Sequence, residues 1–228
     1  MTTLATRCFT LGLVFISSVV AARPDERLRS TELSCDYAKN PTGIDVAQPR
    51  LSWKLTGTKR GLRQTAYQIQ VFSSTNLPPN SSADLWDSGK VISDETHLIR
   101  YAGKKLTPSQ QVFWNVRVWD ENDQASASSD FASWTMGLLK SDDSNLSESS
   151  ATGWKAKWIC AQSASDSLLM RKEFSVKPGL KRAIAHVTGL GQYEMSLNGA
   201  KVGSDLLSPG WTDYNDTVLY DTRDITTR

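Results

Sequence analysis

The sequence predicts an all-β protein, with a sandwich of the fibronectin type III or immunoglobulin kind followed by an incomplete second β-sandwich. Short runs in which apolar and polar residues alternate recur along the chain, as expected for strands with one buried face. Clusters rich in Gly, Pro, Asn, Asp and Ser separate these runs and indicate turns. After the first residues, almost no stretch has the spacing of an amphipathic helix.

The first domain is predicted over residues 30–139. Its strand patterns lie at residues 50–55, 67–71, 112–118 and 131–136. The clearest places Val112, Trp114, Val116 and Val118 on one face and Asn115 and Arg117 on the other. About seven short strands over about a hundred residues suit a two-sheet sandwich. No cysteine pair brackets Trp53 or Trp114, which disfavours an antibody-type domain.

The second domain is predicted over residues 154–228, after a polar linker at residues 140–153. Trp154 and Trp158 open it, and strands are expected at residues 168–176, 182–188, 192–197, 202–206 and 217–220. Its length is small for an independent sandwich, because a short chain buries little apolar surface. Either this segment packs on the first domain, or the chain is cut short.

Residues 1–22 have the layout of a secretory signal peptide. Arg7 precedes an apolar run over residues 9–20, and Ala22 occupies the expected cleavage position. The run is too short to cross a bilayer comfortably, although an uncleaved anchor is the alternative. We therefore expect an exported protein that begins near Arg23 and is secreted, or periplasmic in a Gram-negative host.

Charge and cysteine content exclude several classes of protein. The chain has 26 Lys and Arg and 24 Asp and Glu, interspersed, which gives no support for a nucleic-acid or membrane partner. Cleavage would leave Cys35 and Cys160, whose spacing matches neither a zinc site nor a redox pair. Free thiols are the simpler interpretation, and disulfide pairing stays open. We expect no metal site and no cofactor.

The loop that follows the Asn198-Gly199 turn is the candidate carbohydrate-binding site. Trp211, Asp213 and Tyr214 lie together in it, and a flat ring can pack on a sugar face while its polar edge stays wet. The alternatives are a Trp211 ring that covers a hydrophobic core and an Asp213 that forms a turn. The sequence also contains glycosylation sequons, at Asn80, Asn145 and Asn215.

Several segments resemble the N-terminal, non-catalytic region of bacterial-type α-L-rhamnosidases. They are NPTGIDVAQPRLSWKL (residues 40–55), RGLRQTAYQIQV (60–71), LWDSGKV (85–91), FWNVRVWDEN (113–122) and GLGQYEMSLNGAKVGSDLLSPGWTDYNDTVLY (189–220). The resemblance covers nearly the whole chain in consistent order. It implies a fibronectin type III-like leader followed by the start of a β-sandwich N-domain.

The resemblance further implies an exported enzyme that hydrolyses terminal α-L-rhamnose with inversion, so that a rhamnose-containing carbohydrate is the implied ligand. In that family the acid and base lie in an (α/α)6 barrel, and this chain has no helical repeat, so no catalytic residue is carried over. The chain is thus expected to be an accessory region that is inactive alone, with the catalytic barrel of the parent enzyme as its partner. A stand-alone secreted carbohydrate-binding β-protein is the alternative.

The chain's own residues select no catalytic group. Glycoside hydrolysis usually needs two carboxylates across the scissile bond. Nothing in the sequence selects a pair from Glu173, Glu194, Asp205, Asp213 and Asp216. His97 and His186 both lie in strand patterns and are expected to be structural.

Overall fold

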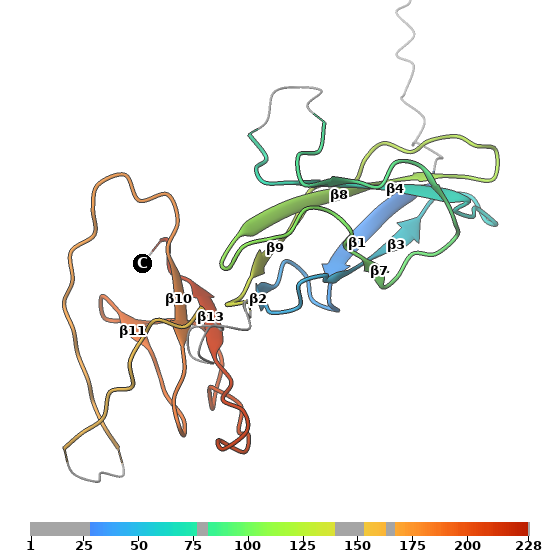
Figure 1. Ribbon diagram of the computed structural model, residues 1–228. Coiled ribbons are helices and arrows are strands. Elements are labelled where there is room, and N and C mark those ends of the chain that lie inside the picture. Colours follow the sequence, from blue (N-terminus) through green and yellow to red (C-terminus); the bar gives the residue numbers. More distant parts are fainter. Residues whose placement is uncertain (1–27, 77–81, 140–152, 163–166, 228) are drawn as a thin grey trace, which may run out of the picture.

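The computed structural model describes residues 28–76, 82–139, 153–162 and 167–227 (Figure 1). The predicted leader at residues 1–22, Asn80, Asn145 and nearly all of the predicted linker lie outside them. Every regular element in the described ranges is a β-strand. The strands form a first unit, β1 to β9, and a second unit, β10 to β13, beside β2 and β9 (Figure 1).

The first unit is a sandwich of an open sheet and a larger mixed sheet. The smaller sheet has the order β1 (Arg29–Cys35), β3 (Arg50–Thr56) and β7 (Ile99–Arg100). The larger has the order β2 (Thr42–Ile44), β9 (Ala132–Met136), β8 (Gln111–Trp119), β4 (Ala66–Phe72) and β5 (Trp86–Asp87), with β6 (Val91–Ile92) also paired to β4. β2 runs parallel to β9, while β4, β8 and β9 pair antiparallel.

The core between the two sheets is built on tryptophan and β-branched residues. Trp114 is fully buried on β8, and its ring meets Trp134 edge to face at 6.4 Å between centroids. Tyr101 continues this aromatic chain at 5.8 Å from Trp134, and Trp86 lies 5.5 Å from Tyr101. Such edge-to-face pairs add to the burial of apolar area, so this row holds the two sheets together.

The strand patterns of the first domain are confirmed. Residues 50–55 lie in β3, 67–71 in β4, 112–118 in β8, and 131–136 match β9 to within one residue. The predicted row Val112, Trp114, Val116 and Val118 is fully buried. Asn115, on the other face of β8, is buried as well.

The second unit contains two short antiparallel pairs. β10 (Ile184–Val187) pairs with β13 (Asp221–Asp224), and β11 (Ser196–Leu197) pairs with β12 (Ala200–Lys201). The predicted Asn198-Gly199 turn joins β11 to β12, with φ of 51° and 80°. Positive φ at both central residues is what a two-residue hairpin turn requires, which explains the Asn-Gly sequence.

Several strand predictions for the second unit are wrong. Residues 168–176 form no strand, and the strands nearest 202–206 and 217–220 are Ala200–Lys201 and Asp221–Asp224. Within residues 192–197 the only regular strand is Ser196–Leu197, beside an isolated bridge from Tyr193 to Ser208. The alternating sequence is present at residues 168–176, but no described strand pairs with them. His97 likewise lies in the loop before β7 rather than in a strand. Alternation predicts a strand only where a partner supplies the hydrogen bonds.

Within the described residues, no helix is long and apolar enough to span a membrane.

Candidate functional site

The predicted carbohydrate-binding loop lies at the surface of the second unit. The Trp211 side chain is 77% exposed, so it does not cover a hydrophobic core formed by the described residues. Gly210 precedes it and packs near Leu219, which leaves the indole on the outer side of the loop. The Trp211 ring is thus available for contact with a ligand.

Asp213 and Tyr214 have structural contacts in the same loop. Oδ1 of Asp213 accepts hydrogen bonds from the backbone N and the side-chain Nδ2 of Asn215, at 3.0 and 3.1 Å. The Tyr214 hydroxyl accepts a hydrogen bond from the backbone N of Gly191 at 2.9 Å. The structure therefore brings the predicted residues into one loop, but Asp213 and Tyr214 shape that loop as well as being candidates for binding.

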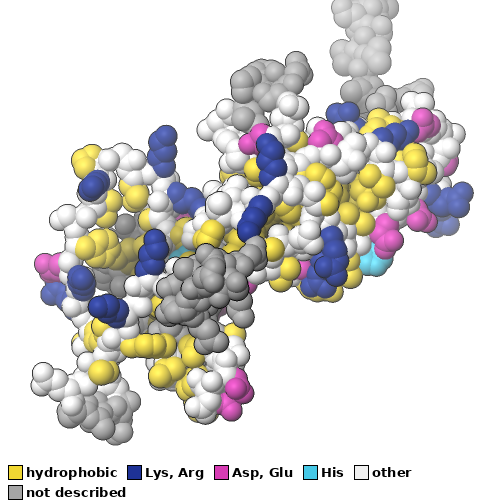
Figure 2. All heavy atoms as spheres, viewed as in Figure 1, with side chains coloured by type: hydrophobic (Ala, Val, Ile, Leu, Met, Phe, Trp, Pro, Cys, Tyr) yellow, Lys and Arg dark blue, Asp and Glu magenta, His cyan; other side chains and the backbone are white. Residues whose placement is uncertain are grey.

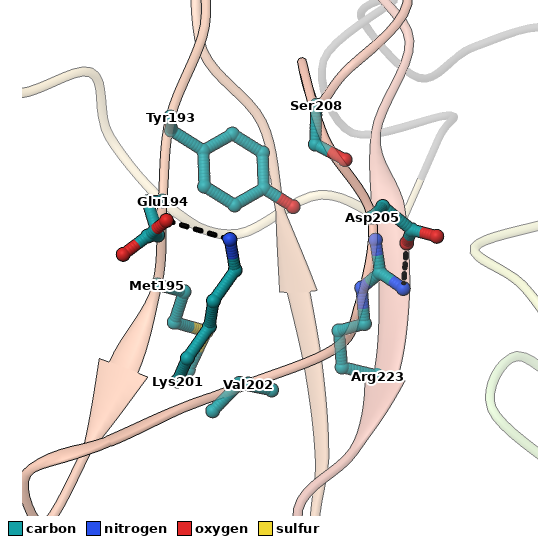
Figure 3. A pocket seen from close by; sticks show the side chains of 8 residues that line it. All are labelled: Tyr193, Glu194, Met195, Lys201, Val202, Asp205, Ser208 and Arg223. Atoms are coloured by element: carbon teal, nitrogen blue, oxygen red, sulfur yellow. Dashed lines mark hydrogen bonds and ion pairs between the residues drawn. The ribbon is translucent and has the colours of Figure 1, made fainter.

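A cluster of paired charges lies around the β11–β12 hairpin and β13 (Figure 3). Lys201 pairs with Glu194 at 2.6 Å, and Arg223 pairs with Asp205. The Tyr193 hydroxyl donates to Oδ2 of Asp221 at 2.6 Å. Burial raises the pKa of Tyr193, and the carboxylate of Asp221 raises it further.

The cluster encloses too little space for a sugar. Its cavity, between Tyr193, Met195, Val202 and Arg223, has a volume of ≈ 10 Å³. That is about the volume that one water molecule needs, far below the roughly 300 Å³ of a small-molecule site. The enclosed part of the cluster therefore stabilises the β11–β12 hairpin against β13. A more open groove of ≈ 490 Å³ lies beside it, lined by Gln192, Tyr193, Glu194, Lys201, Asp205, Leu206 and Leu207.

The junction of the two units is the best-defined polar site of the molecule. His186 on β10 bridges the units: its Nε2 lies 2.9 Å from Oγ of Ser109 in the first unit. Its Nδ1 lies 3.0 Å from Oγ1 of Thr222 on β13. Desolvation lowers the pKa of His186, and the nearby Asp45 acts in the opposite direction. The imidazole is thus held mainly neutral between two hydroxyl groups.

Tyr220 forms a second bridge across the junction. Its hydroxyl donates to Oδ1 of Asp45 at 2.6 Å and accepts from the backbone N of Leu138 at 2.7 Å. Its ring lies 5.6 Å from that of His186 and 6.0 Å from that of Trp154. Burial raises the pKa of Tyr220, and the hydrogen bond to Asp45 raises it further. The phenol therefore stays protonated and keeps donating.

Arg182 adds a third bridge. Its Nη1 donates to the backbone oxygen of Ser109 at 3.0 Å, and its Nη2 donates to Oγ1 of Thr135 at 2.7 Å. Thr42 closes the other side, where its Oγ1 donates to the backbone oxygen of Thr222 at 3.2 Å. Because each bridge joins different strands, together they fix the angle between the two units.

Two glycines at the junction allow the two units to pack in close contact. Gly43 has φ of +85°, and a Cβ there would lie 2.6 Å from Oγ1 of Thr222. A Cβ at Gly137 would overlap the carboxylate of Asp45 and the hydroxyl of Tyr220. The sequence gives no signal for this junction, apart from the structural role predicted for His186, since its partners lie far apart along the chain.

Ion pairing and burial account for several of the remaining titratable groups. Among the described residues, Glu173 pairs with Arg171, and no group of His, Cys, Asp or Glu side chains is arranged to hold a metal ion. The thiols of Cys35 and Cys160 are free, and burial raises the pKa of Cys35 to about 12, so that this thiol is unreactive at neutral pH. In the part of the chain that the structure describes, the acidic residues considered for catalysis are thus explained by ion pairs, turns or exposure.

Two family models match the chain. The Rha78A-like, N-terminal immunoglobulin domain matches residues 30–140, and the α-L-rhamnosidase N-terminal domain matches residues 179–228.

Curated relatives and a solved structure give the same result. The chain is 39% identical over 201 residues to an α-L-rhamnosidase of Alteromonas sp. (strain LOR), covering 82% of this chain and 21% of that protein. It is 35% identical over 202 residues to an α-L-rhamnosidase of Formosa agariphila, with the same coverage. The structure of α-L-rhamnosidase from Dictyoglumus thermophilum superposes with a TM-score of 0.75 at 36% identity, covering 87% of this chain and 23% of that one.

The chain spans about a fifth of the length of the curated relatives that it matches. Both matched regions follow the order of the two units seen in the structure. The chain therefore belongs to the α-L-rhamnosidase family, of which it carries the N-terminal immunoglobulin-like domain and residues of the N-terminal domain that follows.

Proposed function

We propose that this chain is the non-catalytic N-terminal region of a secreted α-L-rhamnosidase, whose hydrolysis of terminal α-L-rhamnose takes place in an (α/α)6 domain beyond these 228 residues. The match of both N-terminal modules, with about a fifth of the relatives' length covered, carries this proposal. Among the described residues, Glu173, Glu194 and Asp205 each pair with a basic side chain, and every regular element is a strand.

The junction suggests what the region contributes to the enzyme. His186, Tyr220 and Arg182 hold the immunoglobulin-like unit to the N-domain by hydrogen bonds from different strands. A rigid connection lets the first unit act as a fixed support for the N-domain, rather than as a module on a free tether. We infer that the region serves as a scaffold for the catalytic domain.

Export is part of the proposal. The charged start, apolar run and small residue at position 22 support a cleaved secretory signal. A protein secreted, or delivered to the periplasm, would meet plant glycosides or polysaccharides directly. Processing is tested by mass spectrometry of the chain secreted from a host cell, where we expect a new N-terminus near Arg23.

Activity is tested by a chimera. The chain would be joined to the residues that follow the matched region in the Alteromonas sp. α-L-rhamnosidase. We expect the chimera to release nitrophenol from an aryl α-L-rhamnoside and the 228-residue chain to release none. Release by the chain alone would overturn the accessory role.

A stand-alone carbohydrate-binding protein is the second candidate, and the exposed ring of Trp211 favours it. Calorimetric titration of the chain with rhamnose distinguishes the two. Binding that weakens on Trp211→Ala would support a sugar-binding module, and the absence of heat would support the scaffold alone.

A further inference from the structure

Residues 168–176 form an extended apolar segment without a partner. They lie in the arc that leads from residue 167 toward β10 and stays outside the β10–β13 pair (Figure 1). No backbone hydrogen bond joins them to any other described residue. Nine consecutive residues therefore present their backbone donors and acceptors to solvent, like the edge of a sheet.

The segment is already sorted into two sides. Residues two apart share a side in an extended chain. Arg171 and Glu173 are two apart and form an ion pair, which identifies the more polar side, although Leu169 shares it and is 100% exposed. The other side carries large apolar residues that are about half exposed or more: Leu168 (47%), Met170 (54%), Phe174 (64%) and Val176 (57%). We refer to these four as the open face.

The open face is part of a wider exposure of apolar side chains. Figure 2 shows hydrophobic side chains at the surface of the second unit, among scattered Lys and Arg. Leu206 and Leu207 are 81% and 70% exposed. Large exposed apolar side chains gathered on one unit are typical of an interaction site.

Lys172 defines the chemistry of the partner. It shares the side of Met170 and Phe174, is exposed, and forms no ion pair with a described residue. A strand that covers this side must place apolar residues opposite the open face and an acidic residue opposite Lys172. The alternative, a buried ammonium group without a counter-charge, would be strongly unfavourable.

A second copy of the chain fits poorly. Lys172 is the centre of the segment, so antiparallel pairing of two copies about this centre would place Lys172 against Lys172 on the covered side. Parallel pairing in register does the same. Such a dimer would bury the open faces only with two ammonium groups facing each other, and the Arg171–Glu173 pairs gained on the outer side contribute little.

We propose that residues 168–176 are a docking strand for a β-strand from the remainder of a longer α-L-rhamnosidase chain, one that alternates apolar residues around a central Asp or Glu. This inference rests on the proposed function, because the relatives are about four times as long as this chain and supply that remainder. Strand addition satisfies the free backbone groups and buries the open face in one step.

The test supplies the remainder as a separate polypeptide. The 228-residue chain is mixed with the part of the Alteromonas sp. α-L-rhamnosidase that follows the matched region. We expect hydrogen exchange within residues 168–176 to slow by at least roughly tenfold on binding, as for newly formed sheet bonds. Phe174→Asp and Lys172→Glu should each raise the dissociation constant at least roughly tenfold.

Ile92→Asp is the matched control. Ile92 is 77% exposed on β6 of the first unit, so its replacement changes surface apolarity equally but away from the open face. It should leave the dissociation constant unchanged. Binding without protection of residues 168–176, a stronger complex with Lys172→Glu, or self-association of the chain through this segment would each overturn the proposal.

The chimera keeps the inference testable if the separate polypeptide fails to fold. Exchange within residues 168–176 is then compared between the chimera and the 228-residue chain. Slower exchange in the chimera supports docking. An active chimera in which the segment exchanges as fast as before would leave the proposed function standing and refute the docking strand.

Discussion

The hydroxyl of Tyr220 donates a hydrogen bond to Oδ1 of Asp45 at 2.6 Å, across 175 residues of sequence. The hydroxyl oxygen of Tyr220 also accepts a hydrogen bond from the backbone N of Leu138, at the end of the first unit. One phenol thus joins the loop after β2, the segment after β9 and the residue before β13. Its removal leaves a backbone donor and a carboxylate without this partner.

Tyr220→Phe is expected to lower the free energy of unfolding by about 1–3 kcal/mol, because the partly buried backbone N of Leu138 loses its acceptor and Asp45 loses its donor. Urea unfolding followed by circular dichroism measures this loss. Tyr214→Phe is the control, since that hydroxyl contacts only Gly191 N in an exposed loop, and should cost about 1 kcal/mol or less. Equal losses in the two variants would contradict the bridging role of Tyr220.

Gly43→Ala tests the close approach of the two units. Alanine at φ of +85° is strained, and its Cβ would meet Thr222. Gly61→Ala is the control that measures the backbone strain alone, since Gly61 has φ of +81° and no atom lies within 4 Å of an added Cβ. Both should lose roughly 1–2 kcal/mol from strain. Gly43→Ala should lose about 1–3 kcal/mol more from the overlap. Unfolding free energies that agree for the two variants would refute the contact.

Acid is expected to weaken the junction through His186. Its pKa in the folded chain lies below the ordinary 6.5, so the unfolded chain binds more protons as pH falls. Stability is therefore fully present above about pH 6.5 and is lost as pH falls through this value toward the folded pKa. Melting temperatures measured between about pH 7 and pH 5 should fall.

His186→Asn should flatten this pH dependence, while His97→Asn should leave it as in the parent chain, because His97 lies exposed in a loop beside Glu95. Equal slopes for the parent chain and His186→Asn would show that other groups cause the loss.

Trp211→Ala is expected to change the free energy of unfolding by no more than about 0.5 kcal/mol, because the ring is exposed. If the loop binds sugar, the same variant should weaken rhamnose binding in a calorimetric titration. Trp158→Ala is the control, since Trp158 is 62% exposed in the same unit. A large loss of stability in Trp211→Ala would show that the ring packs on the protein instead.

The sequence predicts the first unit well because its strands find their partners within that unit. Alternation over 112–118 corresponds to a strand paired on both sides, with β4 and β9. The same alternation over 168–176 fails, since pairing depends on a neighbour that the pattern cannot supply. Local sequence reports the tendency of a strand to bury one face, and the rest of the fold decides whether that face is covered.

Part of the candidate site could likewise be predicted from the sequence, and part could not. Trp211, Asp213 and Tyr214 come together because they are neighbours in one loop, which composition reveals. The junction was not predicted, because Ser109 and His186 are 77 residues apart and neither has a distinctive neighbourhood. His186 was expected to be structural, and its bridging position agrees with that prediction.

The position of the junction along the chain sets the order in which the two units can fold. All strand pairs of the first unit lie between Arg29 and Met136, so this sandwich can close while the second unit is still being made. The bridges to Ser109 and Asp45 need His186, Tyr220 and Thr222, which leave the ribosome after the whole first unit. The folded first unit thus provides a surface against which the later strands pack as they emerge from the ribosome.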